Sequence, residues 1–222
     1  MADVNTAEGA PKGPEARAAE RTATMLRHAK LVCQSGEYLC RIRDISALGV
    51  GLTFHHQVPP EPRILLQLAN TLTYPIERVW LGKRQAGYRF GCEVSASEFV
   101  SEQGGVEPRA LRLNISAPAR INANGIVSEA RLLDISCGGA KIASDHTHTA
   151  NRQVGLQLAG LPTQIGTIGW LGSGTFGLRF ERALSSKELA NCALYLQPYG
   201  QPRPSGFSDL ANAASDTNKA AA

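Results

Sequence analysis

Residues 42–52 read IRDISALGVGL, and residues 132–142 read LLDISCGGAKI. Both stretches carry the pattern D-x-S-x-x-G where one strand-like run of apolar residues ends and the next begins. Every matching residue lies ninety positions after its counterpart. The matching residues are Asp44, Ser46 and Gly49 in the first stretch and Asp134, Ser136 and Gly139 in the second. The two stretches therefore occupy the same place in two copies of one unit.

The offset of ninety continues on both sides of this pattern without a gap. LQLA begins at 66 and again at 156, WLG at 80 and at 170, and Gly87, Arg89 and Phe90 recur as Gly177, Arg179 and Phe180. Such matches predict a tandem duplication. We expect a first domain at 15–104 and a second at 105–200. The tails at 1–14 and 201–222 have few large apolar residues to bury and are expected to be disordered.

Each unit contains six short strand-like segments, separated by turns rich in Gly, Pro and polar residues. This number of strands in so short a unit favours a closed β-barrel, because closure leaves no exposed edge. Each unit ends in a candidate helix, SASEFVSEQGG in the first and SSKELANCALYL in the second. The predicted fold is mainly β, with two tandem six-stranded barrels, each with a short C-terminal helix.

The composition argues against several classes of function. A formal charge of +4 with 19% charged residues lacks the dense basic stripe of a nucleic-acid-binding protein, and no apolar run suits a membrane span. Five cysteines without C-x-x-C, and an N-terminal segment without an apolar signal core, predict a reduced, cytoplasmic protein. Histidines pair at 55–56 and at 146 and 148 without a shared ligand set, so we expect solvated loops and no metal. No catalytic motif is present, and we expect no enzyme activity.

The D-x-S-x-x-G turn has two readings. Asp and Ser at alternate positions project from one side of a strand, beside a glycine that is free to adopt positive φ and leaves the backbone bare. A carboxylate accepts two parallel hydrogen bonds, which matches the N1–H and N2–H donors of guanine. On the other reading, Asp and Ser only fix the turn, as they do in many proteins.

A pair of arginines precedes the first strand of each unit. Arg17 and Arg21 lie upstream of the first turn, and Arg109 and Arg112 lie upstream of the second. Guanidinium groups bind phosphate with two bonds, read guanine and stack on base planes better than lysine does. The arginines are four residues apart in the first unit and three apart in the second. Arm and turn together predict a pincer for a guanine nucleotide, with the first unit as the better candidate.

An arginine pair, then about 22 residues, then D-x-S-x-x-G and a strand pair such as RVWLGKRQAGYRF, resembles the PilZ domain family. The resemblance covers residues 17–103 and 109–198. It implies a six-stranded barrel in a bacterial receptor for the second messenger cyclic di-GMP. It further implies that the arginine pairs and the turn residues hold the ligand. These residues are Arg17, Arg21, Asp44, Ser46 and Gly49, and then Arg109, Arg112, Asp134, Ser136 and Gly139.

The resulting hypothesis is a non-catalytic receptor that couples cyclic di-GMP to an unidentified partner protein. Coupling would proceed by rearrangement of the arginine-bearing arm and of the two barrels. No cofactor, nucleic-acid partner or membrane insertion is expected. The alternative is a ligand-independent adaptor, in which barrel surfaces and the terminal helix dock a protein and the polar turns are architectural. Trp80 and Trp170, at equal places near strand ends, are expected in the core.

Overall fold

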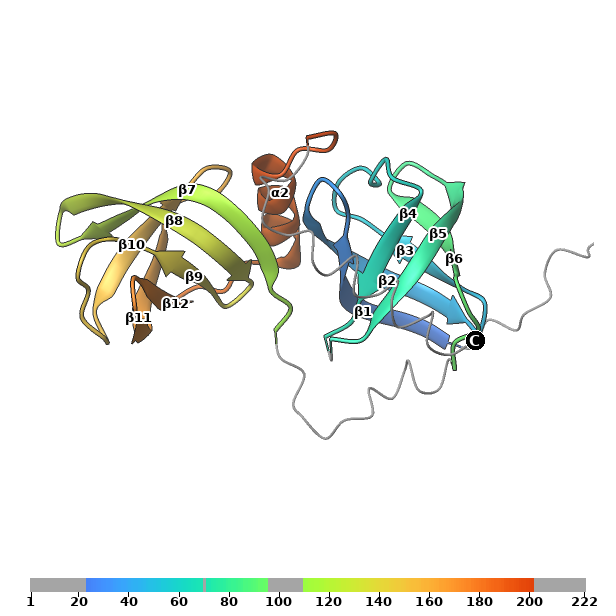
Figure 1. Cartoon of the computed structure of the whole chain (residues 1–222), viewed down its shortest axis with the longest axis horizontal. Helices are drawn as coiled ribbons and strands as arrows, with labels where there is room; N and C mark the ends of the chain where they lie inside the picture. The colour runs from blue at the N-terminus through green and yellow to red at the C-terminus, as the bar shows by residue number, and fades with distance from the viewer. Residues whose placement is uncertain (1–22, 70, 96–109, 202–222) are drawn as a thin grey trace, which may run out of the picture.

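The computed structural model describes residues 23–69, 71–95 and 110–201, which form two closed antiparallel β-barrels (Figure 1). In the first barrel the strands follow the order β1-β2-β3-β6-β5-β4, and β4 pairs with β1 to close the ring. Its strands are β1 (Ala23–Val32), β2 (Glu37–Ser46), β3 (Gly49–Thr53), β4 (Arg63–Gln67), β5 (Thr73–Leu81) and β6 (Gln85–Phe90).

The second barrel repeats this arrangement in the order β7-β8-β9-β12-β11-β10, closed by the pairing of β10 with β7. Its strands are β7 (Leu113–Ala123), β8 (Ile126–Ser136), β9 (Gly139–Ala143), β10 (Gln153–Leu158), β11 (Gln164–Gly172) and β12 (Thr175–Phe180). Helix α2 (Ser186–Leu196) follows the last strand. Each strand begins about ninety residues after its counterpart, as a duplication requires.

The predicted fold class is confirmed, because the described chain is mainly β and forms two six-stranded barrels. The helix predicted at the end of the second unit is also present. The predicted tails, apart from Gln201, lie outside the described residues. So do the boundary at 104/105 and all but the first residue of the helix predicted after the first unit. No helix in the described part of the chain is long and apolar enough to cross a membrane.

The first hairpin of the second barrel differs from the prediction. The sequence suggests a loop at 124–129, whereas only Asn124 and Gly125 form the turn and β8 begins at Ile126. Both turn residues have positive φ, 53° for Asn124 and 85° for Gly125. An Asn-Gly pair suits this conformation, which matches the twist of two strands joined by a two-residue turn. The hairpin is therefore longer than a reading of polar residues as loop implies.

The interior of each barrel is filled by alternate residues of its strands. In β7, for example, Ala117, Ala119 and Ile121 are buried, whereas Pro118 and Arg120 between them are exposed. This period of two is what a strand with one buried face requires. The buried apolar residues of both barrels and of α2 form one continuous cluster. The two barrels therefore share a core.

Helix α2 lies between the two barrels (Figure 1). A capping box begins it: the Ser185 hydroxyl accepts from the backbone N–H of Glu188, and the Glu188 carboxylate accepts from the backbone N–H of Ser185. The Arg182 guanidinium, and then Ser185, lower the pKa of Glu188 to about 2. The capping box thus fixes the N-terminal end of α2, the helix that packs between the two barrels.

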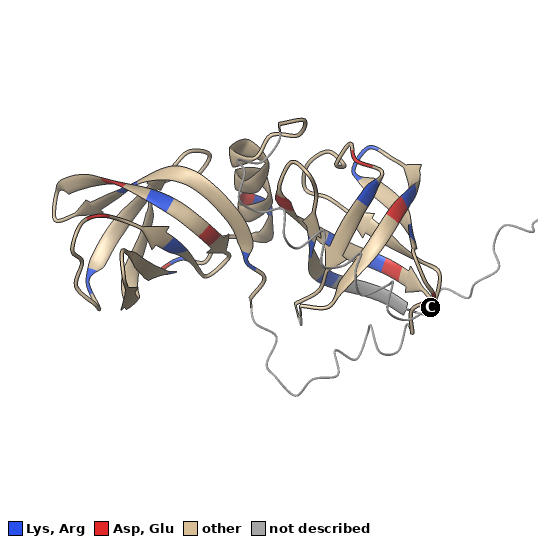
Figure 2. Ribbon diagram, in the orientation of Figure 1, with Lys and Arg blue, Asp and Glu red and all other residues tan. Residues whose placement is uncertain are grey.

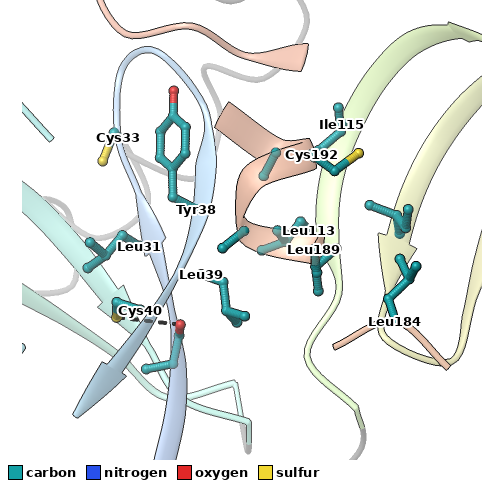
Figure 3. Packing of buried hydrophobic residues seen from close by; sticks show 14 of the residues in the cluster. Leu31, Cys33, Tyr38, Leu39, Cys40, Leu113, Ile115, Leu184, Leu189 and Cys192 are labelled. Atoms are coloured by element: carbon teal, nitrogen blue, oxygen red, sulfur yellow. Dashed lines mark hydrogen bonds between the residues drawn. The ribbon is translucent and has the colours of Figure 1, made fainter. Parts of the chain in front are cut away.

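The apolar contacts of α2 reach both barrels (Figure 3). Leu39 of β2 approaches the helix from the first barrel, and Leu113 and Ile115 of β7 approach it from the second. All three side chains are at most 2% exposed. The buried residues of the helix are Leu189, Ala190, Cys192 and Ala193. Burial of the outward-facing Leu39 requires the helix, because residues on this side of β2 otherwise face solvent.

A polar cluster, which we call the interface cluster, joins the same elements. The carboxylate of Glu37 accepts from the backbone N–H of Asn114 at 2.8 Å and from its side-chain amide at 3.0 Å. Lys30 lies 2.9 Å from Glu37 in the same buried place. Gln197 accepts from the Glu37 N–H, and its backbone carbonyl accepts from the Tyr38 hydroxyl at 2.6 Å. Because buried polar groups are costly when unpaired, this cluster fixes how the barrels meet.

His56 is part of this junction rather than a solvated loop residue, so the prediction for its side chain is wrong. The ring is 6% exposed and packs against the rings of Tyr38, Phe54 and Tyr199. Its Nδ1 lies 2.7 Å from the carbonyl oxygen of Gln57. Burial lowers the pKa of His56 below its ordinary value of 6.5. Tyr199, near the end of the described residues, therefore helps to bury a histidine that the sequence places in a polar loop.

We expect this histidine to make stability depend on pH. The unfolded chain binds the His56 proton more readily than the folded protein, so stability decreases as the pH falls below about 6.5. His56→Phe keeps a ring in the cluster and removes the titration, so its free energy of unfolding falls less between pH 7 and pH 5. Urea denaturation at several pH values measures both slopes. If the free energy of unfolding fell equally with pH in wild type and in His56→Phe, His56 would not be the source of the pH dependence.

Candidate ligand-binding site

The glycines of the two turns are required for space. Neither Gly49 nor Gly139 uses the positive φ that a glycine is free to adopt. A Cβ on Gly49 would lie 2.7 Å from the carbonyl oxygen of Tyr88, and one on Gly139 would collide with the carbonyl oxygen of Leu178. These carbonyls belong to the neighbouring strands β6 and β12, whose backbone cannot yield cheaply. Glycine therefore lets the turn pack closely against the next strand.

The serines of the motif hold the turn in the unbound protein. The Ser46 hydroxyl accepts from the N–H of Gly49 at 3.2 Å and lies 3.3 Å from its carbonyl oxygen. The Ser136 hydroxyl donates to the carbonyl of Gly139 at 3.2 Å and is buried. Such bonds are typical of Ser at turns. The architectural reading of the motif thus fits both serines, whereas the aspartates are left for other contacts.

Four residues on neighbouring strands form a row across the outer face of the first barrel. Asp44 of β2 pairs with Gly51 of β3. Gly51 pairs in turn with Gly87 of β6, and Gly87 with Trp80 of β5. Directly paired residues point to the same side of a sheet. The Asp44 and Trp80 side chains therefore stand at the two ends of a floor made by two glycines, and we call this row the platform.

Trp80 and Trp170 lie on the surface, so the prediction that they belong to the core is wrong. Their exposed fractions are 43% and 46%. A Cβ on Gly87 would overlap the indole of Trp80, and one on Gly177 would overlap that of Trp170. Each indole therefore covers the bare backbone of a glycine in the neighbouring strand. An exposed indole held in this way offers a flat surface on which another ring can stack.

Arg43 lies over the platform. Its Nε donates to the Asp44 carboxylate at 2.6 Å, and its Nη1 donates to the Gln85 side chain at 2.7 Å. The guanidinium carbon lies 5.8 Å from the centre of the Trp80 ring. A β-bulge between Ile42 and Asp44 explains how two consecutive side chains reach the same face. The arginine thus contacts both ends of the platform.

The corresponding row of the second barrel is occupied by a side chain. Asp134 pairs with Lys141, Lys141 with Gly177, and Gly177 with Trp170. Lys141 therefore stands where the first barrel has Gly51. Its ammonium lies 6.0 Å from the centre of the Trp170 ring. The second barrel keeps the aspartate and the tryptophan but has a lysine in place of the first glycine between them.

The arginines predicted for the arms are only partly described. Arg112 reaches the turn aspartate of the second barrel, with its Nη1 2.7 Å from Oδ1 of Asp134. The other three, Arg17, Arg21 and Arg109, lie outside the described residues. The structure therefore brings together one arm arginine and one turn aspartate, on the second barrel.

Sequence analysis missed Arg43, Gly51 and Gly87 as neighbours of Asp44. The recurrence of Gly87 and Trp80 at the offset of ninety indicated that the two residues belong together, because in each copy the tryptophan ring packs on the glycine. The pairing register was needed to connect them, since these residues lie on four different strands. The bulge at Arg43 has no sequence signature of its own.

The wider surface adds no second class of site. Figure 2 shows Lys and Arg interspersed with Asp and Glu along the strands of both barrels. Within residues 23–69, 71–95 and 110–201, no group of three or more His, Cys, Asp or Glu side chains comes together to hold a metal ion. The five cysteines are free thiols, and burial raises the pKa of Cys192 to about 12. None of these groups competes with the platform as a candidate site.

The sequence of residues 15–101 matches the family model of the PilZ domain. This segment contains the whole first barrel, its D-x-S-x-x-G turn and the platform. The first barrel is a PilZ domain. The second barrel repeats the strand order of this PilZ domain and its turn motif, which is consistent with two tandem copies.

Solved structures were also compared with the chain. The PlzA protein of Borreliella burgdorferi in complex with c-di-GMP is 12% identical, with 77% of this chain and 88% of that chain covered and a TM-score of 0.34. The Bacillus subtilis inhibitor of motility MotI/DgrA is 8% identical, with coverages of 76% and 93% and a TM-score of 0.33. YcgR from Escherichia coli in complex with c-di-GMP is 13% identical, with coverages of 87% and 88% and a TM-score of 0.28. No curated protein matches the sequence.

Proposed function

We propose that this protein is a non-catalytic receptor for cyclic di-GMP, with its working site on the platform of the first barrel. The observation that carries the proposal is the row in which a carboxylate lies over Gly51 and an exposed indole lies over Gly87, on neighbouring strands of the outer face. The PilZ match of the same segment agrees with a cyclic di-GMP ligand. The absence of catalysis, of a metal or other cofactor and of a nucleic-acid partner, and a cytoplasmic location, are parts of this proposal.

The platform suits a guanine base that lies flat on the first barrel. The Asp44 carboxylate accepts from N1–H and N2–H of the base, because its oxygens match that donor pair. The two glycines let the Asp44 carboxylate and the Trp80 indole lie close to the backbone, and the exposed indole gives the base an aromatic neighbour. Arg17 and Arg21 are proposed to bind the phosphates, since guanidinium groups bind phosphate with paired bonds. Ser46 and Gly49 hold the turn on which Asp44 stands.

The second barrel offers a partial version of this site. Arg109, Arg112 and Asp134 are proposed as its ligand contacts, on a turn held by Ser136 and Gly139. Its floor is filled by Lys141 rather than left bare. We therefore propose the first barrel as the principal receptor.

Coupling to a partner is proposed to proceed through the arginine-bearing arm of the first barrel. The shared core and the interface cluster favour two barrels that move as one body, so the ligand acts on the arm and on the surface near the platform. Val79 and Leu81, 67% and 60% exposed, flank Trp80 on β5 and would suit an apolar partner. The same residues would serve a ligand-independent adaptor, which is the alternative function.

Calorimetric titration with cyclic di-GMP tests the receptor function. We expect the wild-type protein to bind, and Asp44→Asn to bind roughly tenfold more weakly, because a neutral acceptor replaces a charged one. Asp134→Asn is the matched control on the second barrel, and its affinity for the first site should equal that of wild type. Absence of heat and of a thermal shift at tens of micromolar ligand in wild type would refute the receptor function and favour the adaptor.

A further inference from the structure

Arg43 presents on the platform the same chemical group that a guanine base would bring there. One edge of guanine is a planar N–C–N unit whose N–H donors face a carboxylate. The guanidinium of Arg43 is also a planar N–C–N unit with N–H donors. Its Nε–H donates to Asp44 Oδ2 at 2.6 Å, and the guanidinium carbon, Cζ, lies 5.8 Å from the centre of the Trp80 ring. A third contact, Nη1 to Gln85 at 2.7 Å, holds the group in this position.

Both groups require the same surroundings. A base that pairs two N–H donors with the Asp44 carboxylate needs both of its oxygens, including Oδ2, to which Arg43 donates. A base that stacks beside Trp80 needs the space next to its ring, where the Arg43 guanidinium carbon lies 5.8 Å from the ring centre. The side chains of Arg43 and Asp44 are 33% and 22% exposed, so the pair is open to displacement from solvent. The two occupants are therefore mutually exclusive.

We infer that Arg43 is a built-in competitor, which occupies the guanine position of the platform and leaves it when the nucleotide binds. The inference rests on the proposed function and concerns the regulation of the same site. An internal occupant raises the apparent dissociation constant, because the nucleotide can bind only during the fraction of time that Arg43 has left the site. It also selects against weak ligands, since a group that cannot replace the contacts to Asp44 and Trp80 does not displace the arginine.

The second barrel supports a role that the fold does not require. Leu133 stands at the position that corresponds to Arg43, next to the same bulge in β8. A leucine is thus compatible with this backbone, and the arginine is not needed to form the turn. Arg43→Leu is therefore the variant that removes the competitor with the least risk to folding.

The experiment is calorimetric titration of the full chain with cyclic di-GMP, wild type against Arg43→Leu. Loss of an exposed ion pair and a cation–π contact from the free state should tighten binding roughly three- to tenfold. Arg120→Leu removes a more exposed charge, paired with Glu129 on the second barrel, and its affinity should stay within about twofold of wild type. A second readout does not depend on the affinity: the Nε–H signal of Arg43 in NMR should be resolved in the free protein and lost or shifted when nucleotide binds.

Three results would overturn the inference. Weaker binding by Arg43→Leu would make the arginine a ligand contact, and unchanged binding would make it a bystander. An Arg43 Nε–H signal that does not change on saturation would show that the pair with Asp44 persists in the complex. If neither protein binds cyclic di-GMP, the receptor function itself fails, and the competitor falls with it. This outcome is recognised by the absence of heat in wild type, which the three preceding results do not share.

Discussion

Glu37→Ala is expected to lower the free energy of unfolding by about 3–5 kcal/mol. Glu37 is 2% exposed and lies 2.9 Å from the ammonium of Lys30, whose side chain is 9% exposed. Removal of the carboxylate leaves a buried positive charge without its partner. The same change leaves the N–H and the amide of Asn114, on the other barrel, without an acceptor. Urea denaturation followed by circular dichroism measures the loss.

Two further variants separate this explanation from a general loss of packing. Glu129→Ala breaks an exposed ion pair with Arg120 and should cost less than about 1 kcal/mol. The double variant Lys30→Met with Glu37→Gln removes both charges and keeps an amide for Asn114, so it should recover at least half of the loss. A loss below about 1 kcal/mol for Glu37→Ala, or no recovery in the double variant, would mean that the interface cluster does not hold the barrels.

The fold was predictable because the duplication supplied each strand twice. Strand boundaries, turns and the D-x-S-x-x-G motif recur at one offset, so each copy supports the strand assignment of the other. The interface cluster was not predictable in this way. Glu37 corresponds to Val127 in the second copy, and a charged residue near a hairpin turn reads as solvated. Its burial depends on α2 and on a second barrel, neither of which a local pattern describes.

The site was only partly predictable for a related physical reason. Asp44 was recognisable because its motif is local. Trp80 was misplaced because burial of an aromatic residue is the usual outcome, and only the pairing of β5 with β6 reveals that a glycine supports the ring from outside the barrel. Gly49 was recognised as part of the turn, but the reason for a glycine there was not. A side chain is excluded because a Cβ would meet a backbone carbonyl on β6. Contacts between strands, rather than residue types, decided each case.

Gly51→Lys is expected to weaken cyclic di-GMP binding by more than about 100-fold, which corresponds to roughly 3 kcal/mol. A Cβ at this position would lie 2.5 Å from Oδ1 of Asp44, so the carboxylate must leave the platform. The lysine chain also covers the floor that a base would use, as Lys141 does in the second barrel. Two charge-assisted hydrogen bonds of about 1.5–3 kcal/mol each are sufficient to produce the loss. Gly91→Lys is the matched control, because a Cβ there meets only Pro75, at 3.5 Å or more.

The reciprocal change, Lys141→Gly, should open the second platform. It restores the glycine that the first barrel has at this place, between an aspartate and an indole that are already present. Arg112, now 2.7 Å from Asp134, would remain as an arm arginine. Titration should therefore show one class of site in wild type and a second, weaker class in Lys141→Gly. Two equal classes of site in wild type would contradict this account, because they would show that a lysine on the floor does not exclude the ligand, and Gly51→Lys should then bind as well as wild type.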